Sequence, residues 1–509
     1  MWLGYFFTNA EDGGLRNTNS GWRRVFGSSR RIWLMVSLSL FPRLLVAQDL
    51  DVRSLVGEDW YGLYLNGQKA GYSINSVTVD ENEQAAVSED AHFRVKMSGQ
   101  HQDMRICMRR LYAKDGALVR IDQRIDDPGG AKQFEAWVDN GVFRLKSAVG
   151  GLVKESELPK PRESLKDALK QVELAGPDAQ IGDSVSFSMF EPMYEREIAG
   201  TSRIESIEER MFEGALTKVY RIRSVMPDLG IESDTYVAAD GRTLEDRIGG
   251  IITMRLEPKE MAQDIDYSND VIVSNAAPAD RRVENPRTRD SLRLRIMGPL
   301  AENHLFNDGR QRMAIKEGYV AFESKRSDPS CFRGVPRPVS EASVQEWLKP
   351  TLLVQSGDPR LKAKAQEIIG GEQDAFAAGE ALCHWVYQYV KTTYSARLSN
   401  ALEVLDDPQG DCTEHSILFV GLARAAGIPA REVAGLIYVN ETEPAFYFHQ
   451  WAMIWAGQWV DVDPTFDQPV ADVTHIKLAE GDLYQQAKLI PVIGRLKIAV
   501  EPEEENDTP

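Results

Sequence analysis

Three residues in the last part of the chain are of types that together support nucleophilic catalysis. Cys412 follows a Gly-Asp turn, His449 lies in an aromatic run, and Asp463 lies in the apolar run after that. A thiolate nucleophile needs an imidazole to exchange its proton, and the imidazole needs a carboxylate to hold its tautomer. We therefore predict that Cys412 attacks a carbonyl carbon and forms a thioester, with His449 as base and Asp463 as orienting carboxylate.

The predicted secondary structure brings these residue types together. Apolar residues at helical spacing predict a helix over about 412–426, which a Gly-Ile-Pro sequence ends. Two aromatic and apolar runs, 446–455 and 457–465, predict an antiparallel hairpin with a turn near its middle. This hairpin would place the histidine and the carboxylate on adjacent strands at the same end, facing the helix that carries the cysteine.

The position of Cys412 in the first turn of its helix predicts a reactive thiol. The first N–H groups of a helix are unpaired, and the helix dipole is positive at that end. Both features favour the thiolate, so we expect a depressed pKa for Cys412. The backbone N–H of Cys412 is also a natural donor to the oxyanion of the reaction.

Two roles within the hairpin stay open. Asp461 lies two residues before Asp463 on the same strand face, so position alone does not decide which carboxylate contacts His449. Trp451 also shares a strand face with His449. It either shields the histidine–carboxylate pair from water or belongs to the core.

A zinc site is the alternative interpretation of the same residues. Cys412 and His415 form a Cys-x-x-His spacing, which zinc sites use. A zinc ion there would recruit His449 and Asp463 as further ligands. Because no second paired ligand motif accompanies this spacing, we predict neither a metal nor another cofactor.

Four sequence blocks resemble the core of the transglutaminase-like superfamily, whose members are relatives of papain-type cysteine proteases. In order they are Gly410 to His415, Leu422 to Arg431, His449 to Trp451 and Gln458 to Thr465. The resemblance covers about 347–500 and implies an α+β core in which the helix carrying the cysteine packs on an antiparallel sheet. Position by position, it implies that Cys412 is the nucleophile, His449 the base and Asp463 the orienting carboxylate.

The resemblance also implies the kind of reaction. It favours a thiol-dependent acyl transferase or hydrolase, and we expect a protease or amidase that acts on peptide or protein amide bonds. Two alternatives stay open: a transglutaminase that cross-links protein glutamine residues, and an inert binding or scaffold module. The presence of the cysteine, the histidine and the aspartate weakens the inert alternative, although Met453 stands where many members have a glutamate.

Composition and charge narrow the possible partners. The chain has 509 residues, of which 43% are hydrophobic and 27% charged, as in ordinary soluble proteins. The formal net charge of −18 argues against nucleic acid, because phosphate binding needs clustered Lys and Arg. We expect a peptide or protein substrate instead. Four cysteines are no disulfide framework, and with Cys412 as nucleophile at most one pair can form among Cys107, Cys331 and Cys383.

Composition also predicts a division of the chain into segments. They are a signal peptide or N-terminal anchor at 1–48, a β-rich domain of unknown role at 49–274, a linker at 275–290, a small β subdomain at 291–345, the catalytic core at 346–500 and an acidic disordered tail at 501–509. In the first segment, arginine pairs precede a short apolar run and Val46-Ala47-Gln48 offers a cleavage site. We expect an exported protein, periplasmic or extracellular, with membrane association only through this segment. An uncleaved anchor and a misassigned start codon are the other readings.

The β-rich domain is expected to be separable from the chemistry. Asn-Gly and Asp-Gly turns predict its hairpins, and no cluster of His, Cys and carboxylate precedes the linker. A charged linker with prolines buries little surface, so few contacts should cross it. We therefore expect a fragment that starts at Ser291 to keep the reactivity of Cys412. Further elements predicted by periodicity are a helix at 162–172, a strand at 311–322 and helices at 361–369 and 375–391.

Overall fold

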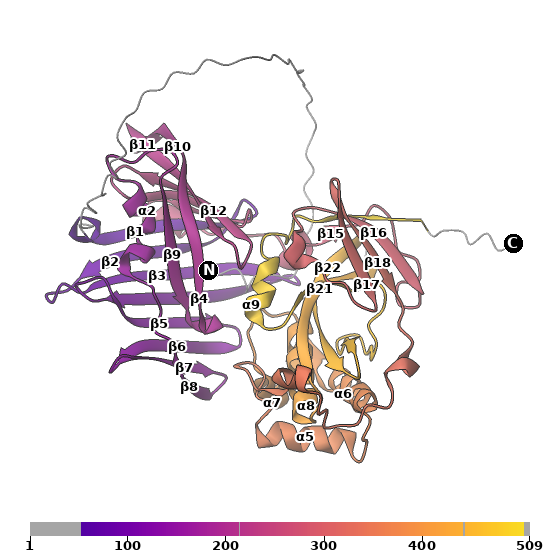
Figure 1. The fold of residues 1–509 in the computed structure, drawn as a ribbon. Coiled ribbons are helices and arrows are strands. Elements are labelled where there is room, and N and C mark those ends of the chain that lie inside the picture. The colour runs from indigo at the N-terminus through magenta and orange to yellow at the C-terminus, as the bar shows by residue number, and fades with distance from the viewer. Residues whose placement is uncertain (1–51, 213, 441–442, 503–509) are drawn as a thin grey trace, which may run out of the picture.

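The computed structural model describes residues 52–212, 214–440 and 443–502 (Figure 1). The predicted export segment 1–48 and residues 503–509 of the predicted tail lie outside these ranges. Within the ranges, no helix is long and apolar enough to cross a bilayer. The N-terminal part is made almost wholly of strands and the C-terminal part mixes helices with strands, so the predicted fold class is confirmed.

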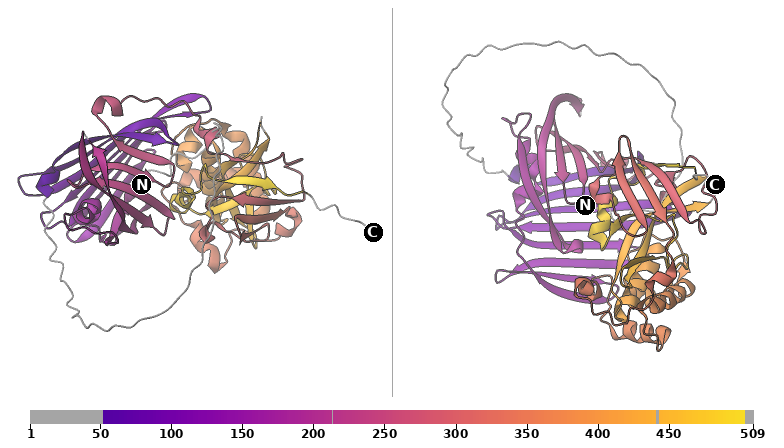
Figure 2. Two further views of the ribbon diagram at one scale, coloured as in Figure 1. Left: turned by 90° about the horizontal axis from the view of Figure 1, so that it is seen from above. Right: turned by 45° about the vertical axis from the view of Figure 1, so that its right-hand side comes forward.

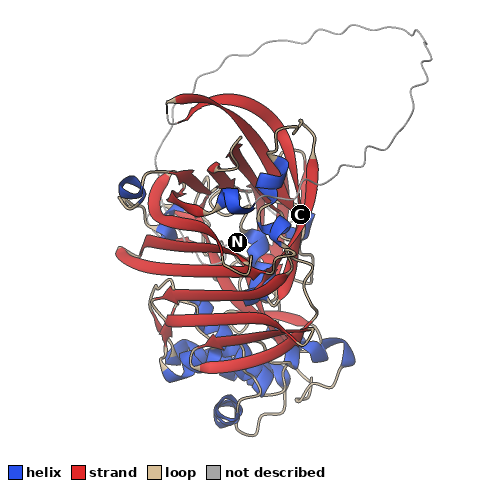
Figure 3. Ribbon diagram, turned by 90° about the vertical axis from the view of Figure 1, so that its left-hand side faces the viewer, coloured by secondary structure: helices blue, strands red, loops and turns tan. Residues whose placement is uncertain are grey.

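The N-terminal part is a strongly curved antiparallel sheet (Figure 3). Two meanders, β1 to β8 and β14 to β9, meet where β1 pairs with β14. Asn66 and Asn140 adopt left-handed backbone conformations before glycines, which is the geometry that two-residue hairpin turns require. The strands are β1 (Gly57–Leu65), β2 (Gln68–Val79), β3 (Ala85–Met97), β4 (Gln100–Tyr112), β5 (Leu118–Asp127), β6 (Gly130–Asp139), β7 (Val142–Val149), β8 (Leu152–Leu158), β9 (Ser184–Glu191), β10 (Arg196–Phe212), β11 (Ala215–Met226), β12 (Ile231–Ala238), β13 (Thr243–Ile248) and β14 (Ile252–Leu256).

Two short helices stand where the sequence predicts one helix over 162–172. They are α1 (Leu165–Ala168) and α2 (Lys170–Leu174), and both contact β9 or β10. The break falls at Leu169, whose backbone leaves the helical region at φ −112° and ψ 24° while its side chain stays buried. Packing of that leucine against the sheet therefore overrides the continuous helical pattern.

The C-terminal part packs helices on a five-stranded sheet. The sheet has the order β15-β22-β21-β24, with β23 paired to β22, and α8 lies against β22 and β21 among α5, α6 and α7. The elements are β15 (Ala277–Pro278), α5 (Pro359–Ile369), α6 (Ala375–Tyr389), α7 (Ala401–Asp406), α8 (Cys412–Ala425), β21 (Ala430–Asn440), β22 (Pro444–Trp455), β23 (Trp459–Val462), β24 (Ile476–Glu480) and α9 (Leu483–Gln486). The predicted helix that carries Cys412 and the predicted hairpin are therefore both present.

A smaller four-stranded sheet stands beside the five-stranded one, in the order β17-β18-β16-β25 (Figure 2). Its strands are β16 (Ser291–Met297), β17 (Gln311–Lys316), β18 (Tyr319–Lys325) and β25 (Lys497–Val500). The sequence predicts one strand over 311–322, and this prediction is wrong. Gly318 has a φ of +83°, and the left-handed backbone there turns the segment into a hairpin.

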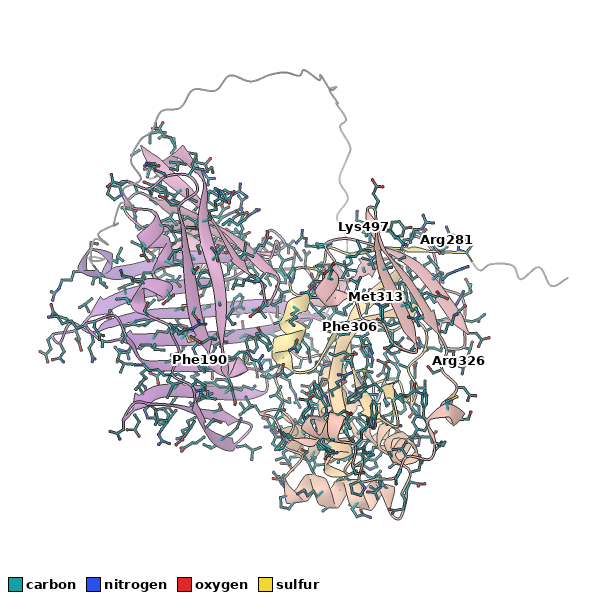
Figure 4. The ribbon with its side chains drawn as sticks, viewed as in Figure 1. Phe190, Arg281, Phe306, Met313, Arg326 and Lys497 are labelled. Atoms are coloured by element: carbon teal, nitrogen blue, oxygen red, sulfur yellow. The ribbon has the colours of Figure 1, made fainter. Side chains whose placement is uncertain are left out.

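The N-terminal sheet holds the segment 394–400 of the C-terminal part. The Gln102 amide donates to the backbone carbonyl of Tyr394 at 3.0 Å, and the Asp127 carboxylate accepts from the backbone N–H of Leu398 at 2.9 Å. Apolar side chains of both parts also belong to one continuous core. In Figure 4, Phe190 of the sheet and Phe306 of the C-terminal part lie on opposite sides of α9.

The segment 275–290, which the sequence predicts as a linker, makes specific contacts with the five-stranded sheet. Its strand β15 pairs with β22. The Arg287 guanidinium donates to the Asp472 carboxylate at 2.8 Å and to the Tyr438 carbonyl at 2.9 Å. These contacts connect the segment to the strands that carry the candidate site.

Candidate active site

Cys412 is the first residue of α8, as predicted. Asp411 caps the helix by accepting from the Thr413 N–H at 2.8 Å, and Glu414 returns the contact by accepting from the Asp411 N–H at 3.0 Å. This capping box begins the helix at the cysteine, and the Cys412 residue as a whole is 8% exposed. Cys412 and His449 line the same cavity, beside Gln450.

The histidine and the carboxylate meet across the predicted hairpin. His449 lies on β22, and Asp463 follows the last residue of β23. His449 Nε2 lies 2.9 Å from Asp463 Oδ2, and both side chains are buried. Contacts with two histidines hold the pKa of Asp463 well below its usual range despite burial, so the carboxylate is ionised and accepts the Nε2–H of His449. Nδ1 is then the nitrogen that is free to accept a proton from a thiol.

The structure decides between the two carboxylates of the hairpin. Asp461 accepts from Trp451 Nε1 at 2.8 Å and from Arg310 Nε at 3.1 Å, and the Lys477 ammonium lies 3.6 Å away. It therefore serves a buried network behind the site, and Asp463 is the carboxylate that contacts the histidine. The ring of Trp451 is fully buried and stacks beside His449 with centroids 6.0 Å apart, so this side chain covers the pair and also belongs to the core.

A second histidine, His475, shares the same carboxylate, and the sequence gives it no recognisable partner. Its Nε2 lies 2.9 Å from Asp463 Oδ2, and its Nδ1 lies 3.4 Å from Asp472 Oδ1. The two carboxylates outweigh burial and raise the pKa of His475 to about 9, so this fully buried ring is a cation at neutral pH. The spacing of the two aspartates around His475 is the only local signal that could have drawn attention to it.

We predict that replacing His475 by glutamine shifts the pH dependence of catalysis. Glutamine can keep an N–H donor for Asp463 but carries no charge. Without the neighbouring cation, the pair of Asp463 and His449 loses a positive charge beside it. The acid limb of kcat/KM should therefore move to higher pH by on the order of one unit, measured on a small amide or ester substrate.

His304 supplies the matched control for this substitution. It is also buried, and its Nε2 hydrogen-bonds the Lys488 carbonyl at 2.8 Å. His304→Gln should lower stability without moving the acid limb. If His475→Gln also left the limb in place, His475 would be a packing residue alone.

The predicted depression of the Cys412 pKa is not what the structure shows. Burial raises the pKa of the thiol well above its ordinary value, and the carboxylates of Asp411, Asp463 and Glu414 act in the same direction. A backbone hydrogen bond from Gln450 opposes them without outweighing them. Desolvation and nearby negative charge thus outweigh the effect of the helix terminus, and the resting group is a thiol.

We expect the alkylation rate of Cys412 to rise with pH and to reach its midpoint above about 8.5, the free-thiol value. The measurement follows iodoacetamide modification of the Cys412 peptide by mass spectrometry across a pH series. Cys331, which is exposed and free, is the internal reference for reagent and protein. A midpoint below about 8.5 would mean that a thiolate–imidazolium pair already exists in the resting protein.

The residues of the alternative zinc site are not brought together. The His415 Nδ1–H donates to the Asp411 carbonyl at 2.7 Å, within the first turn of α8. Among the described residues, the set with ligand atoms within 4.8 Å of one another is His449, Asp463 and His475. Both imidazoles of that set hydrogen-bond the same carboxylate oxygen, which makes it a proton-sharing network. All four cysteines are free.

Comparisons with known proteins identify a domain in the part of the chain that carries these residues. Residues 362–464 match the model of the Transglutaminase-like superfamily, so the chain carries a transglutaminase-like domain. That range contains Cys412, His449 and Asp463 but ends before His475. The chain is 34% identical over 98 residues to an uncharacterised protein of Haemophilus influenzae. The match covers 18% of this chain and spans about a quarter (26%) of that protein's length.

Two solved structures show weaker likeness. A candidate cysteine protease from Cytophaga hutchinsonii is 18% identical with a TM-score of 0.31, and the match covers 43% of this chain and 88% of that one. A β-barrel-like protein from Brucella abortus, with a domain of unknown function, is 12% identical with a TM-score of 0.30. That match covers 39% of this chain and 95% of the other.

Proposed function

We propose that this protein is a cysteine acyl-transfer enzyme that hydrolyses peptide or protein amide bonds. The observation that carries the proposal is the 2.9 Å contact from His449 Nε2 to the ionised Asp463, in a cavity that Cys412 shares. The contact assigns Nε2–H to the carboxylate and leaves Nδ1 to act as base. The match to the transglutaminase-like model over the same residues supports the proposal.

The reaction has two halves. The Cys412 thiol proton passes to His449 Nδ1 as the sulfur bonds to the carbonyl carbon, and the Cys412 N–H at the start of α8 can donate to the oxyanion. The imidazolium then gives this proton to the leaving amine as the C–N bond breaks, which leaves a thioester. Water adds to the thioester while His449 takes its proton, and the C–S bond breaks to release a carboxylic acid and the thiol.

The test is release of a fluorescent amine from a panel of peptide amides by the full chain. Cys412→Ala should reduce the rate to background, and Cys331→Ala, which removes an exposed free cysteine, should leave it unchanged. Rapid acid quenching followed by intact mass measurement should show an acyl group on Cys412.

Three results would overturn the proposal. Release that persists in Cys412→Ala would exclude the thiol as nucleophile. If an added primary amine were incorporated in preference to water, the protein would be a transglutaminase. Complete absence of both reactions would favour the inert binding module.

A further inference from the structure

The cavity at Cys412 continues into a second cavity, and together they form one cleft. The two cavities share Met193, Tyr194, Gln450, Leu483 and Gln486 in their linings. The first also contains the cysteine and the histidine, and the second extends away to the charged residues around Arg196.

One wall of this cleft belongs to the N-terminal sheet. Met97 ends β3, and Met193 and Tyr194 lie in the short 3-10 turn between β9 and β10. The wall is joined to the opposite side by aromatic contacts. The Tyr194 ring lies 5.8 Å from the Tyr484 ring, and the Arg196 guanidinium lies 4.1 Å from the same ring. The sheet is thus held in place against α9.

The floor of the cleft beside Cys412 is also positioned by the sheet. Residues 395–398 line the cavity. The backbone N–H of Ala396 donates to the side-chain oxygen of Gln102, and the backbone N–H of Leu398 donates to the Asp127 carboxylate. Asp127 is itself buried and ion-paired with the buried Lys132. A charged pair that is fully enclosed keeps its geometry because each partner would be costly to leave alone.

The lining near the nucleophile is apolar on both walls. Met97 and Met193 come from the sheet, and opposite them are Leu483, Leu489, Ile490 and Ile493. Several charged side chains along the cleft are ion-paired. Examples are Arg397 with Asp407 at 3.2 Å, and Lys154 with Glu195 at 2.7 Å at the far end. A charged substrate group among these apolar side chains would lose part of its hydration, whereas an apolar group would gain from burial.

We propose that the N-terminal sheet forms one wall of the substrate-binding cleft and that the cleft selects peptides with a bulky apolar residue next to the scissile amide. This inference rests on the proposed function and adds the substrate class to it. It gives Met193 of the sheet a role in substrate specificity, whereas Cys412, His449 and Asp463 carry out the reaction.

The experiment compares peptide amides that differ in one residue beside the scissile bond. With leucine or phenylalanine there, kcat/KM should exceed that for aspartate or lysine by roughly tenfold to a hundredfold, the range expected for burying one such side chain. Met193→Glu should lower kcat/KM for the leucine substrate at least about tenfold and raise the lysine-to-leucine ratio. Leu483→Glu, on the opposite wall, should change the ratio in the same direction.

Met211 supplies the matched control, because it is 69% exposed on β10 and does not line the cleft. Met211→Glu should keep the substrate ranking. Complete alkylation of Cys412 by iodoacetamide, which is small and neutral, should be reached in all variants and shows that the site is folded. If the chain hydrolyses amides but the ranking is flat or survives both cleft variants, the cleft inference is wrong and the proposed function stands. If no substrate is hydrolysed, both are wrong.

Discussion

Asp463→Asn is expected to lower kcat/KM by at least about a hundredfold. The asparagine has no charge to stabilise the imidazolium that forms when His449 accepts the thiol proton. Its amide can also present N–H to Nε2, which would favour the wrong tautomer of the histidine. The buried cation His475 loses one of its two carboxylate partners, so the whole network behind the base is disturbed. The measurement is the rate of amide hydrolysis by the folded variant. Alkylation of Cys412 gives the number of intact sites to which that rate is normalised.

Asp461→Asn is the matched control, since it changes the same side chain two residues away. Asp461 holds Arg310 and Lys477, and neither cation lines the cavity at Cys412. Removing one partner of a buried charge cluster costs stability, on the order of 3–5 kcal/mol, rather than turnover per folded molecule. A loss of turnover at Asp461 as large as that at Asp463 would contradict the assignment of roles.

A fragment that starts at Ser291 is expected to lose the reactivity of Cys412, the opposite of what the sequence predicts. The deletion removes Met97, Met193 and the two side chains that hold the segment 395–398. It also removes β15 and Arg287, which contact the sheet behind the site. Apolar core shared by the two parts would be exposed to water, which favours misfolding or aggregation.

The comparison measures alkylation of Cys412 and hydrolysis of a small ester by this fragment and by the full chain. A chain that starts at Val52 is the control, because it retains every contact named here. It should keep both rates, whereas the Ser291 fragment should lose at least about tenfold in each. Equal rates in the Ser291 fragment would show that the two parts are energetically independent.

The sequence alone determined the parts of the site that depend on local pattern. Helical periodicity behind a Gly-Asp turn placed Cys412 at a helix start, and two aromatic runs around a glycine turn placed His449 and Asp463 on one hairpin. These features depend on neighbours along the chain, so residue types and spacing suffice to predict them.

Only the tertiary structure decided the electrostatics and the walls of the site. Arg310 and Lys477 draw Asp461 away from the histidine, and both come from other elements of the fold. The raised pKa of Cys412 follows from how deeply α8 is buried, which its own sequence does not state. Charge and desolvation act through space. The pKa of a site residue is therefore set by the residues that the fold places around it.

The dependence on packing also explains why the sequence does not predict that His475 and Met193 belong to the site. His475 reaches Asp463 because β24 lies beside β21 in the sheet, and Met193 reaches the cleft because the N-terminal sheet packs on the C-terminal part. Neither contact follows from helical or strand periodicity, since the partners lie on different elements or hundreds of residues apart. Local periodicity predicts elements, whereas the identity of the groups that surround a nucleophile is a property of how those elements pack.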